Sequence, residues 1–175
     1  TYVVAVDDGS VRRPLDVSAI QAAGLEGVVI RLRRNVGHQR AIAIGLSYVA
    51  ETFGDDVIVV AMDSDGEDTP ESISQLVEGL ASDEVDVVVA TRRSRVESLK
   101  FKAFYVVYKW LFSLPSGRQI SFGNFMAANI PAVRRLASMP TTWPHVAASV
   151  LRSQPPLPTF DTDRAQPYAA CSKSN

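Results

Sequence analysis

Short runs of valine and isoleucine alternate with helix-like stretches along the first half of the chain, and this alternation constrains the fold most strongly. The apolar runs are nearly continuous rather than interrupted at every second residue, which is typical of parallel strands covered on both faces. They predict strands at residues 2–6, 28–32, 57–62 and 86–90. Strands that alternate with helices favour an open sheet. The sequence therefore predicts an α/β fold with a mostly parallel sheet flanked by helices.

Two of the intervening stretches carry clear helix signals. Residues 70–82 place apolar side chains at helical spacing, which forms one buried stripe: Ile73, Leu76, Val77 and Leu80. Thr69 before Pro70 predicts a capping side chain followed by a proline at the first helical position. Residues 38–53 predict a second helix, in which Ala41 and Gly45 form a small-residue face that permits close packing.

The pattern changes after residue 96. Residues 99–114 are aromatic-rich and predict either a buried helix or a helix at a membrane surface, with its lysines, Lys100, Lys102 and Lys109, toward water. Residues 121–129 predict a strand, and residues 131–139 a short helix. The proline-rich stretch 155–158 is too short for a domain linker. We therefore expect a single domain over residues 1–175.

Composition excludes several classes of protein. The chain of 175 residues is 46% hydrophobic and 21% charged, as expected of one compact globular domain. A net charge of −1 argues against a nucleic-acid partner. Cys171 is the single cysteine, which excludes an intramolecular disulfide and suits a reducing, cytoplasmic compartment. No apolar run reaches the roughly 20 residues of a membrane span.

Polar clusters follow the first three predicted strands. They are Asp7-Asp8-Gly9-Ser10, Arg34-Asn35-Val36-Gly37-His38 and Asp63-Ser64-Asp65. A turn rich in Asp and Gly explains one such cluster by itself. Because the carboxyl ends of parallel strands meet at one edge of a sheet, we expect these clusters to converge there. Their convergence predicts an active site.

The third cluster has the chemistry of a divalent-cation site. Asp63 and Asp65, two residues apart in a turn, can both offer oxygens to Mg²⁺ or Mn²⁺. Such a cation would bind a diphosphate and stabilise it as a leaving group. Glu67 is either a further ligand or, with Asp68, a favourable charge at the N-terminus of the next helix.

The other clusters suit a nucleotide. Asp7 or Asp8 could accept a hydrogen bond from a base N–H or a ribose hydroxyl, and Gly9 allows close approach of the backbone. Arg92 and Arg93, which follow the fourth predicted strand, either offset phosphate charge or lie solvated on the surface.

The order of these motifs resembles a known family. VDDGS, NVGHQRAIAIGL, VVAMDSDGEDTPE and VVATRR follow one another as in family 2 glycosyltransferases of the GT-A fold. The resemblance is to the branch of dolichol-phosphate mannose synthases and polyprenyl-phosphate glucosyltransferases, which carries D-x-D-x-Q-D-P-P-E where this chain has DSDGEDTPE at residues 63–71. The resemblance runs from residue 3 to about residue 173, and the spacing of the motifs makes it specific.

The resemblance implies an inverting hexosyltransferase that uses a nucleotide-diphosphate sugar donor, with Mg²⁺ or Mn²⁺ as cofactor. It implies a polyprenyl phosphate acceptor, a role in the cell envelope and peripheral contact with the cytoplasmic face of the membrane. Residues 1–96 would bind the nucleotide sugar and residues 97–175 would form the acceptor side. The family's first strand and helix are expected to be missing from the start of this chain.

The resemblance also assigns site residues. The donor-binding set is Asp7, Asp8, Gly9, Ser10, Asn35, Gly37, Asp63, Ser64 and Arg93. The metal ligands would be Asp63, Asp65 and Glu67. The catalytic set is Asp65, Asn124 and Arg92.

The chain departs from the family pattern at three positions that bear on the chemistry. Glu67 replaces the usual Gln, and Ala170 replaces the glycine of a late motif. Asn124 lies where relatives often have an acidic residue, and an amide cannot act as a general base. A lipid phosphate is already anionic at neutral pH and can attack without losing a proton, which favours that acceptor over a sugar hydroxyl.

The sequence also bears on other classes of function. A nucleotidyltransferase would open with a glycine-rich, basic loop after its first strand, and no such loop is visible. A non-catalytic domain of the same fold stays open. A dinucleotide-binding Rossmann domain is disfavoured because no G-x-G-x-x-G opens a helix.

Overall fold

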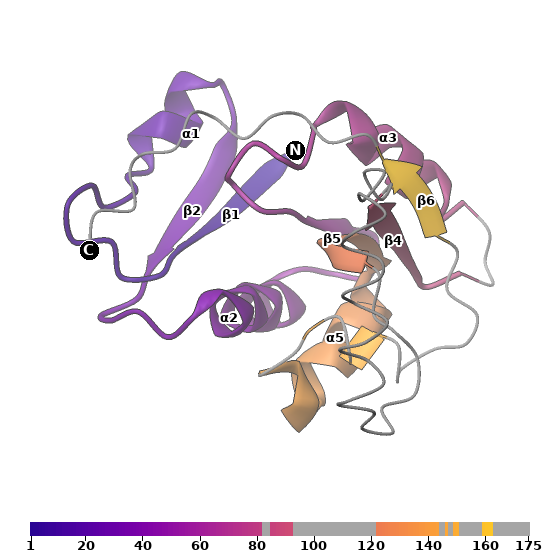
Figure 1. Cartoon of the computed structure of the whole chain (residues 1–175). Coiled ribbons are helices and arrows are strands. Elements are labelled where there is room, and N and C mark those ends of the chain that lie inside the picture. Colours follow the sequence, from indigo (N-terminus) through magenta and orange to yellow (C-terminus); the bar gives the residue numbers. More distant parts are fainter. Residues whose placement is uncertain (82–84, 93–121, 144–145, 147–148, 151–158, 163–175) are drawn as a thin grey trace, which may run out of the picture.

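The structure is a computed structural model that describes residues 1–81, 85–92, 122–143, 146, 149–150 and 159–162 (Figure 1). The strands are β1 (Tyr2–Asp7), β2 (Glu26–Arg31), β3 (Ile58–Ala61), β4 (Val87–Arg92), β5 (Phe122–Asn129) and β6 (Thr159–Thr162). The helices are α1 (Ser18–Ala22), α2 (His38–Thr52), α3 (Glu71–Glu78), α5 (Ile130–Ser138) and the 3-10 turn η1 (Pro140–Thr142).

The strands form a parallel pair and a mixed sheet. β1 pairs with β2 in parallel, and the second sheet has the order β3-β5-β4-β6. β5 runs antiparallel to both β3 and β4, whereas β6 runs parallel to β4. The expected α/β class is confirmed, and the strand predicted at residues 121–129 is β5. Its insertion between β3 and β4 makes the sheet mixed, because β5 returns directly beside the strand that precedes it.

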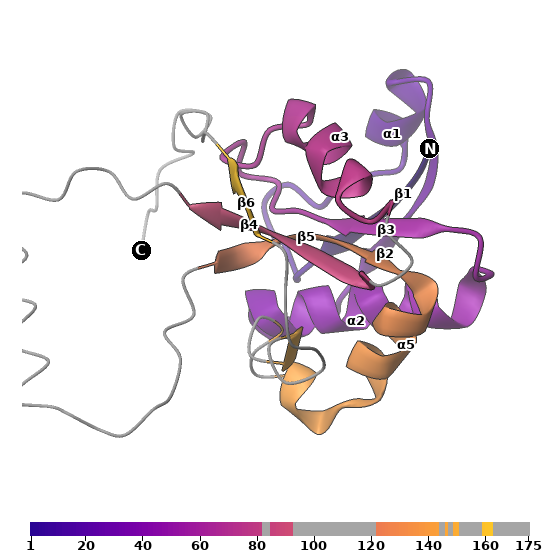
Figure 2. The ribbon, with the colours of Figure 1, turned by 90° about the vertical axis from the view of Figure 1, so that its right-hand side faces the viewer.

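The core lies on both faces of β4 and β5. Val87, Val89, Met126 and Ala128 pack on one face with residues of α2 and α5, including Leu46 and Val133. The alternate residues Val88, Ala90, Phe125 and Ala127 pack on the other face with Leu76 of α3. Figure 2 shows α2 and α5 on one side of these strands and α3 on the other. This arrangement explains why the strand sequences are continuously apolar, since each fully buried side chain contributes roughly 1.5–3 kcal/mol.

The small-residue face of α2 packs as predicted. A Cβ atom at Gly45 would lie 3.1 Å from Val6 Cγ2, so the glycine lets α2 approach β1 closely. Ala41, one turn earlier, is buried. This packing holds the middle of α2 against Val6, near the carboxyl end of β1.

Two local predictions differ from the structure. The short helix α1 was not predicted, because Ile20 is its one buried residue and leaves no periodic apolar signal. The capping role of Thr69 was wrong: α3 begins at Glu71 with Pro70 at its cap position, and the Thr69 hydroxyl lies 2.7 Å from the Ser72 hydroxyl. The Thr69 carbonyl accepts the Ser72 N–H at 3.0 Å, which tightens the turn in place of a side-chain cap.

Several predictions lie outside the described residues. They include the aromatic segment 99–114, the stretch 155–158, Arg93 and Ala170. Within the described part of the chain, no helix has the length and apolar character needed to cross a bilayer.

Candidate functional site

The loops that follow β1 and β2 are joined by hydrogen bonds. Asp8 Oδ1 accepts the Val36 N–H at 2.7 Å, and Asp8 Oδ2 accepts the Gly37 N–H at 3.0 Å. The Leu32 N–H donates to the Asp7 carbonyl at 2.9 Å and extends the parallel pairing by one residue. The first two polar clusters therefore converge at one edge, as the sequence predicted.

Gly9 makes this convergence possible. Its φ is +74°, and a Cβ atom there would lie 2.6 Å from both the Arg34 carbonyl carbon and the Asn35 nitrogen. The close approach that the sequence indicated at this glycine is thus an approach to the protein's own backbone. The two loops touch without an intervening side chain.

Asp7 holds the first loop in shape. It is 6% exposed, and its two oxygens accept the Ser10 N–H at 2.8 Å and the Leu15 N–H at 2.7 Å. The backbone hydrogen bonds from Ser10 and then Leu15 lower the pKa of the Asp7 carboxyl, with smaller contributions from the Ser10 hydroxyl and the Arg31 charge. The carboxylate is therefore ionised and turned toward its own loop.

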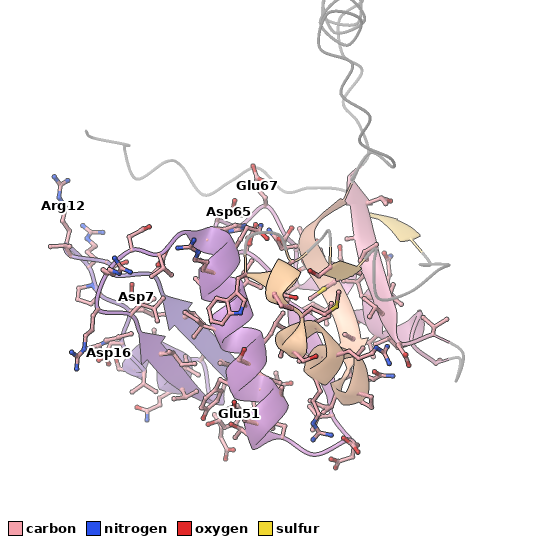
Figure 3. All side chains as sticks on the ribbon, turned by 90° about the horizontal axis from the view of Figure 1, so that it is seen from below. Asp7, Arg12, Asp16, Glu51, Asp65 and Glu67 are labelled. Atoms are coloured by element: carbon pink, nitrogen blue, oxygen red, sulfur yellow. The ribbon has the colours of Figure 1, made fainter. Side chains whose placement is uncertain are left out.

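The acidic residues after β3 likewise organise a turn. Asp68 Oδ2 accepts the Asp63 N–H at 2.9 Å, and Asp65 Oδ1 accepts the Glu67 N–H at 2.9 Å. Gly66 has a φ of +83°, which completes the reversal of the chain. In Figure 3, Asp65 and Glu67 lie beyond the N-terminal end of α2, while Glu51 lies at its other end.

The third loop lies close to the start of α2, where His38 is also in contact with Asn124 of β5. His38 Nδ1 lies 3.8 Å from Asp63 Oδ1, and His38 Nε2 lies 2.7 Å from Asn124 Nδ2. Asn124 Oδ1 accepts from Gln39 Nε2 at 2.9 Å, and Gln39 Oε1 accepts the Val146 N–H at 3.0 Å. Asn124, expected on the acceptor side, is thus connected to the acidic turn through His38.

His38 and Gln39 were not assigned a role from the sequence. The sequence did carry a signal, because three polar residues, His38, Gln39 and Arg40, open the helix directly after a polar loop and before its apolar stretch. Their partner Asn124 is 86 and 85 positions away in the chain, so the pairing could not be read from local spacing.

The other predicted site residues lie on the same loops. Ser10 donates its N–H to Asp7, and Asn35 Oδ1 accepts the Gly37 N–H at 3.1 Å. Ser64 is exposed. Arg92 ends β4, at the same edge as these loops, and nothing is described of its side chain.

The acidic turn carries carboxylate oxygens, the kind of ligand that a hard divalent cation prefers. Within the described residues no group of three His, Cys, Asp or Glu side chains is gathered to hold a metal ion. Mg²⁺ in phosphate-transfer sites usually takes one or two carboxylates and completes its shell with substrate phosphates and water. Asp63 and Asp65 as such a pair, with Glu67 as a third ligand, stay a prediction.

Fold and loops together define an α/β domain whose candidate site lies at the carboxyl ends of its first strands, where such domains bind ligands. The profile of the family described as glycosyl transferase family 2 matches residues 2–129. The chain belongs to this family, as its motifs indicated.

Three curated relatives carry the name undecaprenyl-phosphate 4-deoxy-4-formamido-L-arabinose transferase. The protein of Sodalis glossinidius is 39% identical over 98 residues, which are 55% of this chain and 28% of the relative. That of Edwardsiella ictaluri is 37% identical over 98 residues, with the same coverage of 55% and 28%. That of Salmonella paratyphi B is 33% identical over 118 residues, 66% of this chain and 34% of the relative. The chain therefore spans about a third of the length of the relatives it matches.

Proposed function

We propose that this domain transfers a sugar from a nucleotide-diphosphate sugar to a polyprenyl phosphate, with inversion at the anomeric carbon. The observation that carries the proposal is the proximity of the polar loops: the first two are joined by hydrogen bonds, and Asp63 of the third lies 3.8 Å from His38 of the second. Membership of glycosyl transferase family 2 and the names of the relatives support the reaction class and the lipid-phosphate acceptor.

The donor would lie across the three loops. Asn35 of the second loop and Asp65 of the acidic turn are both exposed and so are accessible to a donor. Asp7 and Asp8 use their oxygens to shape the loops, since both carboxylates accept backbone N–H groups. These two residues therefore serve the nucleotide chiefly by fixing the backbone that it contacts.

Asp63 and Asp65 would hold Mg²⁺ or Mn²⁺ beside the diphosphate. The bound cation would neutralise the charge that develops on the leaving group. Arg92 at the end of β4 is the candidate for further phosphate contact, with Arg93 beside it in sequence. The acidic turn thus supplies the diphosphate end of the donor site.

The chemical step needs no general base in this scheme. An oxygen of the acceptor phosphate forms a bond to the anomeric carbon while the bond to the donor diphosphate breaks, and the nucleoside diphosphate leaves. Because the phosphate is already anionic, Asn124 can occupy the acceptor side without accepting a proton. The reaction would take place at the cytoplasmic face of the membrane, where the lipid carrier is held, and would serve the cell envelope.

The first experiment identifies the donor. Calorimetric titration with UDP-, GDP- and dTDP-sugars, with and without Mn²⁺, should show one base that binds and a requirement for the cation. Transfer of radiolabelled sugar to a polyprenyl phosphate then tests catalysis. Binding without transfer would indicate a non-catalytic domain of the same fold. Equal donor binding in excess EDTA would contradict the requirement for a divalent cation.

Variants of the acidic turn test the ligands. Asp65→Ala should remove most Mn²⁺-dependent donor affinity, whereas Glu51→Ala, at the far end of α2, should not change it. Glu67→Gln should weaken Mn²⁺ binding without abolishing it if Glu67 is a ligand. An unchanged Mn²⁺ affinity in Glu67→Gln would leave that residue a helix-terminus charge only.

A further inference from the structure

The hydrogen bonds around Asn124 have a direction that a single backbone group determines. The Val146 N–H can only donate, so the atom of Gln39 that meets it at 3.0 Å must be the oxygen Oε1. Gln39 then presents its NH₂ group to Asn124, and the atom of Asn124 at 2.9 Å must be Oδ1. The amide of Asn124 is thereby fixed in one of its two orientations.

The orientation of Asn124 determines the tautomer of His38. Asn124 Nδ2 can only donate, and it lies 2.7 Å from His38 Nε2, so that nitrogen must carry a lone pair. A neutral His38 then carries its proton on Nδ1, the nitrogen that lies 3.8 Å from Asp63 Oδ1. A neutral imidazole free in water favours the other tautomer, so the protein imposes this one.

We infer that His38 is a positioning residue that directs an N–H group toward the Asp63 carboxylate. The hydrogen bonds from Val146 through Gln39 and Asn124 hold it as the Nδ1–H tautomer. The separation of 3.8 Å is longer than a hydrogen bond, so the two side chains must approach for the N–H group to reach the carboxylate. The contact would orient Asp63 Oδ1. The inference rests on the proposed function for the role of Asp63, whereas the tautomer does not depend on it.

The arrangement also gives Asn124 a reason to be an amide. An aspartate at this position would only accept, so a neutral His38 would carry its proton on Nε2 and its Nδ1 lone pair would face the Asp63 carboxylate. Asparagine lets one side chain accept from Gln39 and donate to His38. The imidazole ring of His38 therefore links the start of β5 to the acidic turn, because Asn124 contacts its Nε2 and Asp63 lies beside its Nδ1.

The tautomer is tested without any ligand. At pH 8, where an ordinary histidine is neutral, ¹H–¹⁵N correlation across the imidazole ring identifies the protonated nitrogen. The chain has two histidines, so the signal that disappears in His38→Asn belongs to His38. We expect Nδ1 to be protonated in the wild type. A dominant Nε2–H form would overturn the inference and leave the proposed function untouched.

Gln39→Glu tests the direction of these hydrogen bonds at a residue that does not contact His38 through them directly, because Asn124 lies between the two. The glutamate still accepts the Val146 N–H but offers Asn124 an acceptor in place of a donor. Asn124 must then turn its NH₂ group to residue 39 and its oxygen to His38, which moves the His38 proton to Nε2. An unchanged tautomer in Gln39→Glu would show that the hydrogen bonds through Gln39 and Asn124 do not determine which nitrogen of His38 is protonated.

Two near-isosteric variants test the positioning role. His38→Asn retains an N–H near the place of Nδ1, whereas His38→Gln retains a polar group near the place of Nε2 and loses the N–H toward Asp63. The His38 side chain is 52% exposed, so neither change opens the core. We expect His38→Gln to lower Mn²⁺-dependent affinity for UDP, GDP or dTDP about tenfold, as for loss of a hydrogen bond to a charged group, and His38→Asn to lower it much less.

The outcomes separate the two proposals. Equal losses in His38→Asn and His38→Gln, or a larger loss in His38→Asn, would overturn the positioning role. Failure of the wild type to bind any of the three nucleoside diphosphates would remove the proposed function and, with it, the role of His38 toward Asp63. Glu51→Gln, on the same helix at its other end, is the matched control and should bind as the wild type does.

Discussion

Replacement of Gly9 by alanine should separate the first two loops, and its cost can be worked from the structure. An alanine at φ +74° costs roughly 1–2 kcal/mol in backbone strain. Its Cβ would lie 2.6 Å from two backbone atoms of Arg34 and Asn35, which cannot rotate away, and such overpacking costs a further 1–3 kcal/mol or so. The loss of freedom in the unfolded chain offsets about 0.4–1 kcal/mol. We expect the free energy of unfolding to fall by about 2–4 kcal/mol.

Gly24→Ala is the matched control for this experiment. Gly24 has a φ of +71°, but no described atom lies within 4 Å of the place of its Cβ. It therefore carries the backbone strain without the collision, and about 1 kcal/mol is expected. Urea unfolding gives both free energies, and a difference of about 2 kcal/mol corresponds to roughly 4–8 °C in Tm for a chain of this length. Equal destabilisation by the two variants would refute the collision at Gly9.

The remaining predictions concern the carboxylates. Asp8→Asn places an NH₂ group against the N–H of Val36 or Gly37, so urea unfolding should show a loss of about 1–3 kcal/mol. An unchanged midpoint would contradict the structural role of Asp8. Hydrogen bonds lower the folded-state pKa of Asp7, so the unfolded chain binds more protons at acid pH. The stability that Asp7 contributes is therefore present above its ordinary pKa of about 4 and is lost as pH falls through the lower folded value. In Asp7→Asn the free energy of unfolding should fall less steeply as the pH is lowered. An equally steep fall in the variant and the wild type would contradict the lowered pKa of Asp7. The Arg135 guanidinium and the Asn129 amide lower the pKa of Asp86, so Arg135→Gln should raise it, as measured by carboxyl ¹³C titration.

Apolar sequence made the strands predictable. The continuous apolar runs predicted β1 to β4 to within two residues at each end. β4 is covered on both faces, whereas β1, β2 and β3 are only partly buried and are still apolar throughout their inner residues. The short strand β6 and the helix α1 were missed, since neither carries a periodic apolar pattern. The antiparallel direction of β5 was also not predicted, because the apolar content of a strand does not encode which way it runs.

The candidate site was predictable as a place but not as a set of contacts. The convergence of loops follows from strand direction, and the structure bears it out for the first two clusters. Whether a carboxylate faces a ligand or its own loop depends on backbone angles that the residue types do not determine. Asp7 is the clearest example, since both of its oxygens are hydrogen-bonded within its own loop. The link from Asn124 to His38 joins residues 86 positions apart, and one sequence offers no means to find it.

The antiparallel pairing of β4 and β5 has a consequence for how this domain can change. Thr91 pairs with Phe122, so the chain leaves the sheet and re-enters it at neighbouring points of the same edge. In topological terms, β4 and β5 form a hairpin, and residues 93–121 form its connection. The pairing of β5 with β3 and β4 thus fixes the two points between which this part of the chain must run. The parallel pairing of β1 with β2 and the loops after β1, β2 and β3 are made by other parts of the sequence, so a change of length between Arg92 and Phe122 leaves their residues as they are.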